Sequence, residues 1–154
     1  MADVSPPLDD YSRPVSTRAT RLAKVFTLRE RAKREKPGRT VSVVWDERWP
    51  LVNGFVSRYC YVVRFGGRGD IAGNHYHKSK QEIYYALHGA FSVILEDVAT
   101  NTREELKLEA GNNQFIYVAA NIAHVVVARA GDAILLVTAS RPETPEDEFP
   151  YPLV

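Results

Sequence analysis

From Arg39 onward, the apolar residues of this chain come in short blocks rich in Val, Ile, Tyr and Phe, separated by clusters of Gly, Asn or Asp. Blocks of this kind between turn-forming residues are typical of β-strands. With one earlier block, we expect strands at residues 21–27, 40–45, 57–65, 73–77, 82–87, 91–97, 104–109, 114–118, 124–128 and 133–139. Ten short strands with little helix predict an all-β single domain, built as a sandwich or a barrel.

Several of these blocks, such as YCYVV, VVVA and AILLVTA, are apolar on both faces of the expected strand. This pattern indicates that one face fills the core while the other packs on a neighbouring sheet or subunit. We therefore expect the chain to associate with a second copy as a homodimer.

The two ends and one insertion differ from the strand-rich body. Residues 1–16 are acidic and interrupted by proline, which predicts a disordered N-terminus before a domain at residues 17–154. In the stretch TLRERAKREKPG, Thr27 and Glu30 have capping-box spacing and Pro37-Gly38 supplies a stop, so we expect a short helical insertion there. The C-terminal RPETPEDEFPYPLV predicts an extended strap over the body, with the acidic run EDEF in solvent.

The composition excludes several classes of function. Lys and Arg number 20 against 19 for Asp and Glu, so no overall positive charge indicates a nucleic-acid partner. No apolar run approaches the ~20 residues that span a bilayer, and the N-terminus does not resemble a secretory signal. The single cysteine, Cys60, lies among apolar residues, which predicts a packed thiol in a reducing compartment. We therefore expect a cytoplasmic protein.

The stretch GNHYHKSKQE contains two histidines one residue apart and a glutamate five positions later. His75 and His77 fall on the same face of a strand, and Glu82, after the polar turn KSKQ, opens the next strand and can face the same interior. His124, which opens a strand, is a better third ligand than His88, which lies in a turn. Three imidazoles and one carboxylate suit one divalent transition metal: Zn, Fe, Mn, Co, Ni or Cu. Two exposed histidines without a metal are the simpler alternative.

The spacing of the whole segment is more specific than the histidine pair. Gly69, five residues, His75-x-His77, four residues, Glu82, six residues and Gly89 resemble the first motif of the cupin superfamily, G(x)5HxH(x)3-4E(x)6G. A second block from Gly111 to His124 is similar to the second cupin motif, but Ala119-Ala120-Asn121 stands in place of Pro-x-Gly. Asn121 tolerates positive φ, so the turn can be kept. The resemblance implies a cupin (jelly-roll) barrel.

Within that superfamily the chain resembles the sugar-nucleotide cupins: the dTDP-4-keto-6-deoxyglucose 3,4-ketoisomerases and the C-terminal cupin of capsular polysaccharide epimerase-reductases. The segments that carry this resemblance are GNHYHKSKQE, LHGAFSVILED and AILLVTASRPETPEDEFPY. Lys78 matches the ketoisomerases, and Glu82 matches the epimerase domains, which bind zinc. Both groups carry arginine where this chain has Ala72. If a substrate phosphate is bound by arginine, we therefore expect Arg64 or Arg68 to replace that residue.

The resemblance implies a nucleotide-linked keto-deoxysugar as substrate and proton removal next to its ketone. A metal at the predicted site would act as a Lewis acid, and Tyr84 or Tyr61 would then be the general base. In a metal-free version His75 would be the base and Glu82 would orient it, and the two versions exclude each other. Two other readings stay open: a mononuclear iron dioxygenase acting on a small organic substrate, and a non-catalytic barrel that binds a sugar or a metal.

Overall fold

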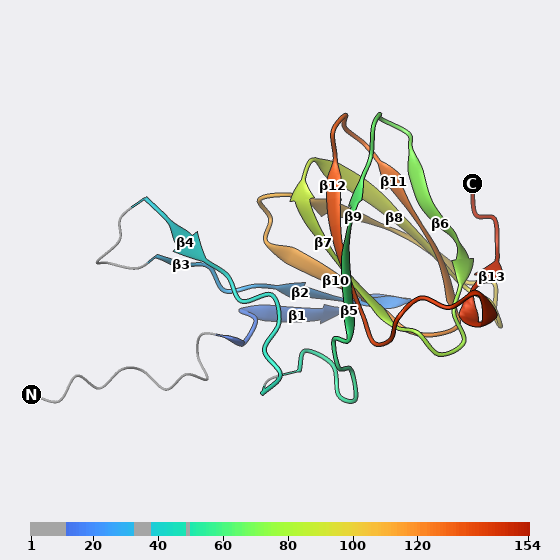
Figure 1. Cartoon of the computed structure of the whole chain (residues 1–154), viewed down its shortest axis with the longest axis horizontal. Helices are drawn as coiled ribbons and strands as arrows, with labels where there is room; N and C mark the ends of the chain where they lie inside the picture. The colour runs from blue at the N-terminus through green and yellow to red at the C-terminus, as the bar shows by residue number, and fades with distance from the viewer. Residues whose placement is uncertain (1–11, 33–37, 49) are drawn as a thin grey trace, which may run out of the picture.

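The computed structural model describes residues 12–32, 38–48 and 50–154, and nearly every regular element in these ranges is a strand (Figure 1). The strands are β1 (Ser16–Ala19), β2 (Ala23–Thr27), β3 (Arg31–Ala32), β4 (Thr40–Val41), β5 (Tyr59–Arg64), β6 (Ile71–Tyr76), β7 (Glu82–His88), β8 (Ala90–Asp97), β9 (Arg103–Glu109), β10 (Gln114–Val118), β11 (Ile122–Ala128), β12 (Ile134–Ala139) and β13 (Phe149–Pro150). One 3-10 helix, η1 (Pro145–Asp147), precedes β13. Within these ranges, no helix has the length and apolar composition needed to cross a bilayer.

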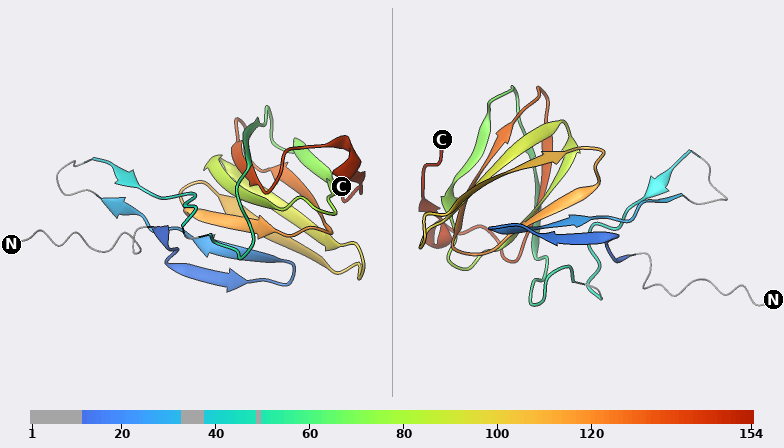
Figure 2. Two further views of the ribbon diagram at one scale, coloured as in Figure 1. Left: turned by 60° about the horizontal axis from the view of Figure 1, so that its bottom comes forward. Right: turned by 180° about the vertical axis from the view of Figure 1, so that it is seen from behind.

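Two antiparallel sheets form the body and face each other (Figure 2). The first has the strand order β1-β2-β10-β7-β12-β5, and the second has the order β13-β6-β11-β8-β9. Strands distant in sequence are therefore neighbours, as when β11 pairs with both β6 and β8. The prediction of an all-β jelly-roll domain is confirmed.

The main core lies between the two sheets, where residues such as Val93, Leu95 and Val118 are fully buried. Part of the outward face of each sheet is also covered by the same chain. Phe26 and Phe115 of the six-stranded sheet pack against residues 44–45 and 51–55. Val125 of the five-stranded sheet packs against the C-terminal residues. This double cover explains why so many strands are apolar on both faces.

Trp45 belongs to the outer cover. Its ring packs edge-on against Phe55, with ring centroids 5.5 Å apart, and Phe55 in turn contacts Tyr117. The tryptophan therefore packs on the outer face of the six-stranded sheet.

The helical insertion predicted from Thr27 and Glu30 is wrong for the described residues. Thr27 ends β2 and pairs with both Ser16 and Gln114, so its backbone belongs to a sheet and is not available to cap a helix. Glu30 accepts a hydrogen bond from Thr40 Oγ1 at 2.6 Å. The segment contains strands β3 and β4, which pair antiparallel, and residues 33–37 of the connection between them lie outside the described residues.

Most of the N-terminus predicted to be disordered, residues 1–11, lies outside the described residues. Ser12 donates a hydrogen bond to Asp46 Oδ2 at 2.5 Å, and β1 begins at Ser16. The sheet therefore begins one residue before the predicted domain boundary.

The prediction of a packed Cys60 is also wrong, because this thiol is exposed. Its strand β5 is an edge strand of the six-stranded sheet, and the outward residues Cys60, Val62 and Arg64 are exposed. Apolar sequence neighbours predicted burial, but the sheet leaves this face of β5 open in the single chain.

Candidate active site

The three predicted histidine ligands converge between the two sheets. His75 is in β6 and is the register partner of His124 in β11, and His77 follows one residue after β6 ends. Their ring centroids are 4.7 to 5.4 Å apart. One ligand nitrogen from each ring lies within 4.8 Å of the others. His88, at the end of β7, is exposed and lies outside this cluster.

Gly73 allows the close approach that brings these two strands together. Its φ is 114°, in the region that favours glycine, and a Cβ atom there would lie 2.5 Å from the backbone oxygen of His124. The register between β6 and β11 shifts between His124 and Val125. Irregularities of this kind are common beside functional sites.

The Nδ1 atom of each histidine lies against an oxygen acceptor. His77 Nδ1 is 2.5 Å from the backbone oxygen of Asp147, and His124 Nδ1 is 3.1 Å from that of Ile122. His75 Nδ1 lies 3.0 Å from a carboxylate oxygen of Glu148. Donation at Nδ1 leaves the lone pair on Nε2, the usual arrangement of a metal-binding or proton-accepting imidazole.

This arrangement fits a transition metal. His77 Nε2 and His124 Nε2 are buried and have no hydrogen-bond partner among the residues that the structure describes. Leaving a buried acceptor without a partner is costly, and a divalent cation bound by several imidazoles would remove that cost.

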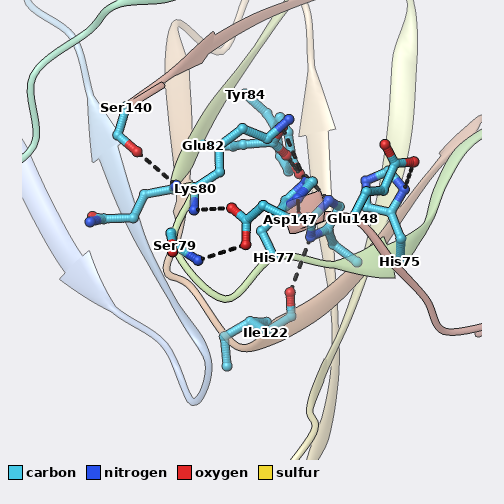
Figure 3. Close-up of polar contacts among 12 residues, drawn as sticks. His75, His77, Ser79, Lys80, Glu82, Tyr84, Ile122, Ser140, Asp147 and Glu148 are labelled. Atoms are coloured by element: carbon cyan, nitrogen blue, oxygen red, sulfur yellow. Dashed lines mark hydrogen bonds and ion pairs between the residues drawn. The ribbon is translucent and has the colours of Figure 1, made fainter. Parts of the chain in front are cut away.

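Glu82 opens β7 beside the histidines, and both of its carboxylate oxygens already have neighbours (Figure 3). Oε1 lies 3.1 Å from Lys80 Nζ and accepts a hydrogen bond from the Tyr61 hydroxyl at 3.3 Å. Oε2 accepts a hydrogen bond from the Tyr84 hydroxyl at 2.5 Å and lies 3.2 Å from His124 Nε2. Glu82 is therefore the centre of a buried polar network.

Burial and the neighbouring charges determine the pKa values of Glu82, His75 and His124. Burial alone would raise the pKa of Glu82, but the charges of His124 and Lys80 outweigh it and lower the pKa to about 2. Burial lowers the pKa of His124 to about 4, and burial together with the nearby His77 lowers the pKa of His75. At neutral pH the site therefore holds the ionised carboxylate of Glu82 beside the neutral imidazoles of His75 and His124.

The two predicted catalytic tyrosines are both placed against Glu82. Burial, followed by the charge of Glu82, raises the pKa of Tyr84 and of Tyr61 well above the usual value for tyrosine. Each hydroxyl is thus held in its protonated form, as a hydrogen-bond donor.

A cavity of about 200 Å³ opens beside this network. It is lined by Tyr61, Val63, Ala72, Gly73, His75, Glu82, Tyr84, His124, Val126, Leu135, Val137 and Glu143. Ala72 is part of its wall, whereas Arg64 and Arg68 are exposed residues outside this lining.

Residues 23–149 match the family model described as FdtA: WxcM-like, C-terminal. The chain belongs to this family. The resemblance to the sugar-nucleotide cupins stated from the sequence is therefore confirmed. Among curated proteins, none matches this WxcM-like chain significantly.

Solved structures share the fold of this WxcM-like chain at low sequence identity. The 4-keto-6-deoxy sugar epimerase NovW from Streptomyces spheroides is 17% identical, with a TM-score of 0.72, 86% of this chain and 71% of that chain covered. The 3,5-epimerase RmlC from Legionella pneumophila, in complex with dTDP-4-keto-L-rhamnose, is 15% identical, with a TM-score of 0.73. The match covers 88% of this chain and 76% of that chain. The 3,4-ketoisomerase QdtA from Thermoanaerobacterium thermosaccharolyticum, in complex with TDP, is 14% identical, with a TM-score of 0.69. The match covers 85% of this chain and 89% of that chain.

Three residues of the site were not predicted from the sequence. Lys80 falls in the stretch predicted as a polar turn, yet it is buried and faces Glu82. Asp147 and Glu148 were expected in solvent, and that prediction is wrong because both contact the site through its histidines. In contrast, the ammonium of Lys78 lies outside the cavity, 4.4 Å from the ring centre of Phe149. The alternation of residues along strands predicts only which way strand residues face, so it could not predict contacts made by Lys80 in a turn or by Asp147 and Glu148 in the C-terminal strap.

Proposed function

We propose that this protein is an isomerase or epimerase that moves a proton next to the ketone of a nucleotide-linked 4-keto-6-deoxysugar. The single observation that carries the proposal is the cavity in which His75, Glu82 and two tyrosine hydroxyls meet beside apolar walls. The family match and the sugar-nucleotide enzymes among the similar folds support the substrate class. We place the protein in the cytoplasm as part of this proposal.

The proton-transfer role falls to His75. This residue lines the cavity, and the carboxylate of Glu148 on Nδ1 would stabilise the imidazolium that forms when Nε2 takes a proton. The tyrosines predicted as bases suit the opposite role, because their raised pKa values favour donation. Tyr61, which lines the cavity, would turn its hydroxyl from Glu82 Oε1, 3.3 Å away, and donate its hydrogen bond to the oxygen that gains charge as the substrate proton leaves.

A metal version of the site is the second candidate, and the two buried Nε2 atoms without hydrogen-bond partners in the described chain support it. His75, His77 and His124 would hold one divalent transition metal, with Glu82 beside them as the fourth ligand predicted from the sequence. The metal would supply Lewis acidity toward the substrate oxygen. His75 would then orient rather than transfer a proton, and Tyr61 or Tyr84 would have to be the base.

Solvent exchange tests the proposal. Incubation of the protein in D₂O with a dTDP-linked 4-keto-6-deoxysugar is expected to place deuterium at a carbon next to the ketone. NMR of the sugar measures the rate of this exchange. His75→Asn is expected to lower the exchange rate by about 10²-fold or more, because general base catalysis contributes about that much. His88→Asn, which changes an exposed histidine outside the site, is the matched control. Equal rates in both variants would contradict the role of His75.

The same preparations separate the alternatives. Exchange that survives chelation supports the metal-free version, and exchange that chelation stops and a divalent metal restores supports the metal version. Oxygen uptake with Fe(II) and no exchange would favour a dioxygenase. Tight binding of the nucleotide sugar without exchange would favour a non-catalytic barrel.

We also propose that the chain forms a homodimer through the outward face of β5, β12 and β7. The register places Val62, Leu136 and Tyr85 side by side there, with Leu87 exposed nearby. Strands β3 and β4, which project from the body, pair with no other strand of the described chain (Figure 1). A second copy would cover this apolar sheet face.

Size-exclusion chromatography with light scattering tests the dimer. Val62→Asp with Leu87→Asp is expected to give a monomer, because burying two carboxylates in an interface is costly. Ile71→Asp, which changes an equally exposed apolar residue of the other sheet, is expected to stay a dimer. A wild-type monomer at micromolar concentration would contradict the proposal.

A further inference from the structure

Lys80 is a buried lysine whose ammonium points at the carboxylate of the site. Only 3% of the residue is exposed, and its Nζ lies 3.1 Å from Glu82 Oε1. A buried ammonium is costly unless a negative charge pairs with it. A turn of this kind usually sends its lysines into water, as it does with the exposed Lys78.

The turn that carries Lys80 is held on both sides, so its inward direction is built into the fold. The backbone N–H groups of Ser79 and Lys80 donate to the Asp147 carboxylate, at 3.1 and 2.9 Å (Figure 3). The backbone N–H of Lys78 donates to the same carboxylate at 2.8 Å. On the other side, Gln81 N–H donates to Ser140 Oγ, and Ser140 N–H donates to the Gln81 backbone oxygen.

The lysine takes up coordination capacity of Glu82. A carboxylate has about four lone-pair sites. Lys80 and Tyr61 take up sites on Oε1 and Tyr84 takes up one on Oε2, whereas His124 Nε2, which carries a lone pair, lies 3.2 Å from Oε2 without donating to it. A divalent ion bound by Glu82 would therefore have only the site beside His124 Nε2, and there it would lie within a few ångströms of the Lys80 ammonium. Like charges at such a separation repel strongly in a buried site.

We propose that Lys80 is a positioning residue that holds Glu82 as its own ion-pair partner and so withholds it from a metal. The three imidazoles then bind a divalent metal without the carboxylate and with reduced affinity. The inference rests on the proposed site, and it explains how a glutamate at the ligand position is compatible with the metal-free version. Removal of the lysine converts Glu82 into a fourth ligand.

Cobalt binding by the full chain tests this inference, because Co²⁺ reports both affinity and ligand number through its visible absorption. Lys80→Met is expected to bind Co²⁺ at least about tenfold more tightly than the wild type, because a repelling charge is gone and a carboxylate is released. In the wild type, Glu82→Gln is expected to change the affinity by less than about threefold, but on the Lys80→Met background it is expected to cancel the gain. Lys107→Met, an exposed lysine of β9, is the charge-matched control.

Thermal unfolding supplies a second readout. Without metal, Lys80→Met is expected to unfold at a lower temperature than the wild type, since it leaves a buried carboxylate without its cation, and added Co²⁺ is expected to raise that temperature more than in the wild type. If Lys80→Met does not fold, Lys80→Gln keeps a neutral side chain that can still donate to Glu82, and the same gain in affinity is expected.

Each remaining result overturns the inference in a distinguishable way. If Lys80→Met binds Co²⁺ no more tightly while Glu82→Gln weakens binding in the wild type, Glu82 is a ligand despite Lys80, and the metal site stands. If no variant binds Co²⁺, the inference and the metal version fail together. Solvent exchange in the same preparations then shows whether the isomerase proposal holds.

Discussion

Single residues of this protein have roles that depend on atoms far away in sequence. Gly73 is the clearest case. Its φ is positive, and an added Cβ atom would lie 2.5 Å from the His124 backbone oxygen, so β6 and β11 meet at a point where only glycine fits. The histidine geometry therefore depends on a residue that carries no chemistry.

Gly73→Ala is expected to destabilise the protein by about 2–4 kcal/mol, because backbone strain adds to a steric clash. Urea unfolding measures the change. Gly111→Ala is the matched control: its φ of 92° imposes the same kind of strain, but nothing lies within 4 Å of its added Cβ. Its loss is expected to be about 1 kcal/mol, and equal losses in the two variants would contradict the steric role of Gly73.

At the scale of elements, the C-terminal strap is as much a part of the site as any strand of the sheets. β13 pairs with β6 at Tyr76 and His75. Asp147 and Glu148, just before it, contact His77 and His75. Asn74 fastens the segment beyond, because its side-chain oxygen accepts a hydrogen bond from Leu153 N–H. The strap thus fixes the orientation of two imidazoles.

Asp147→Asn is expected to lower stability by about 1–3 kcal/mol and to speed amide exchange at residues 78–80. The reason is that the amide group replaces one accepting oxygen with a donor that faces a backbone N–H. Hydrogen exchange followed by mass spectrometry or NMR measures the effect. Glu146→Gln, the same charge change at the exposed neighbouring position, is expected to leave exchange unchanged. Unaltered exchange in Asp147→Asn would show that the turn does not need this carboxylate.

Elements also show where sequence patterns succeed. Strand composition and turn residues located β10 to the residue, and β7, β8 and β9 to within one residue at each end. The same method predicted a helix from Thr27 and Glu30, because capping spacing is a local signal. Sheet pairing of Thr27 with two strands overrode it. The short strands β1, β3 and β13 were missed, since pairing rather than composition makes them strands.

At the scale of the whole molecule, burial of the histidines links folding to pH. The pKa of His124 is about 4 in the folded chain and 6.5 in its ordinary state. Between these values the unfolded chain binds a proton that the folded chain does not, so stability falls as pH decreases from about 6.5 to about 4. Glu82, with a lowered pKa of about 2, adds a further loss below about 4.5.

In the metal-free protein, His124 alone is expected to cost about 3 kcal/mol of stability across that range. Denaturant unfolding at several pH values measures the slope. His124→Asn is expected to flatten it, and His88→Asn, which changes an exposed histidine, is expected to leave it as in the wild type. Parallel curves for all three proteins would contradict the assignment.

The sequence by itself determined the all-β architecture, the inward side of β7 and the set of histidines. These follow from alternation along strands and from motif spacing, which are local properties of the chain. Only the tertiary structure decided what surrounds Glu82, because Lys80 enters from a turn and Tyr61 from a strand 21 residues away. It also decided that Asp147 and Glu148 reach the histidines and that Cys60 is exposed. Burial and charge pairing depend on contacts between residues that are distant in sequence, and local sequence patterns do not predict such contacts.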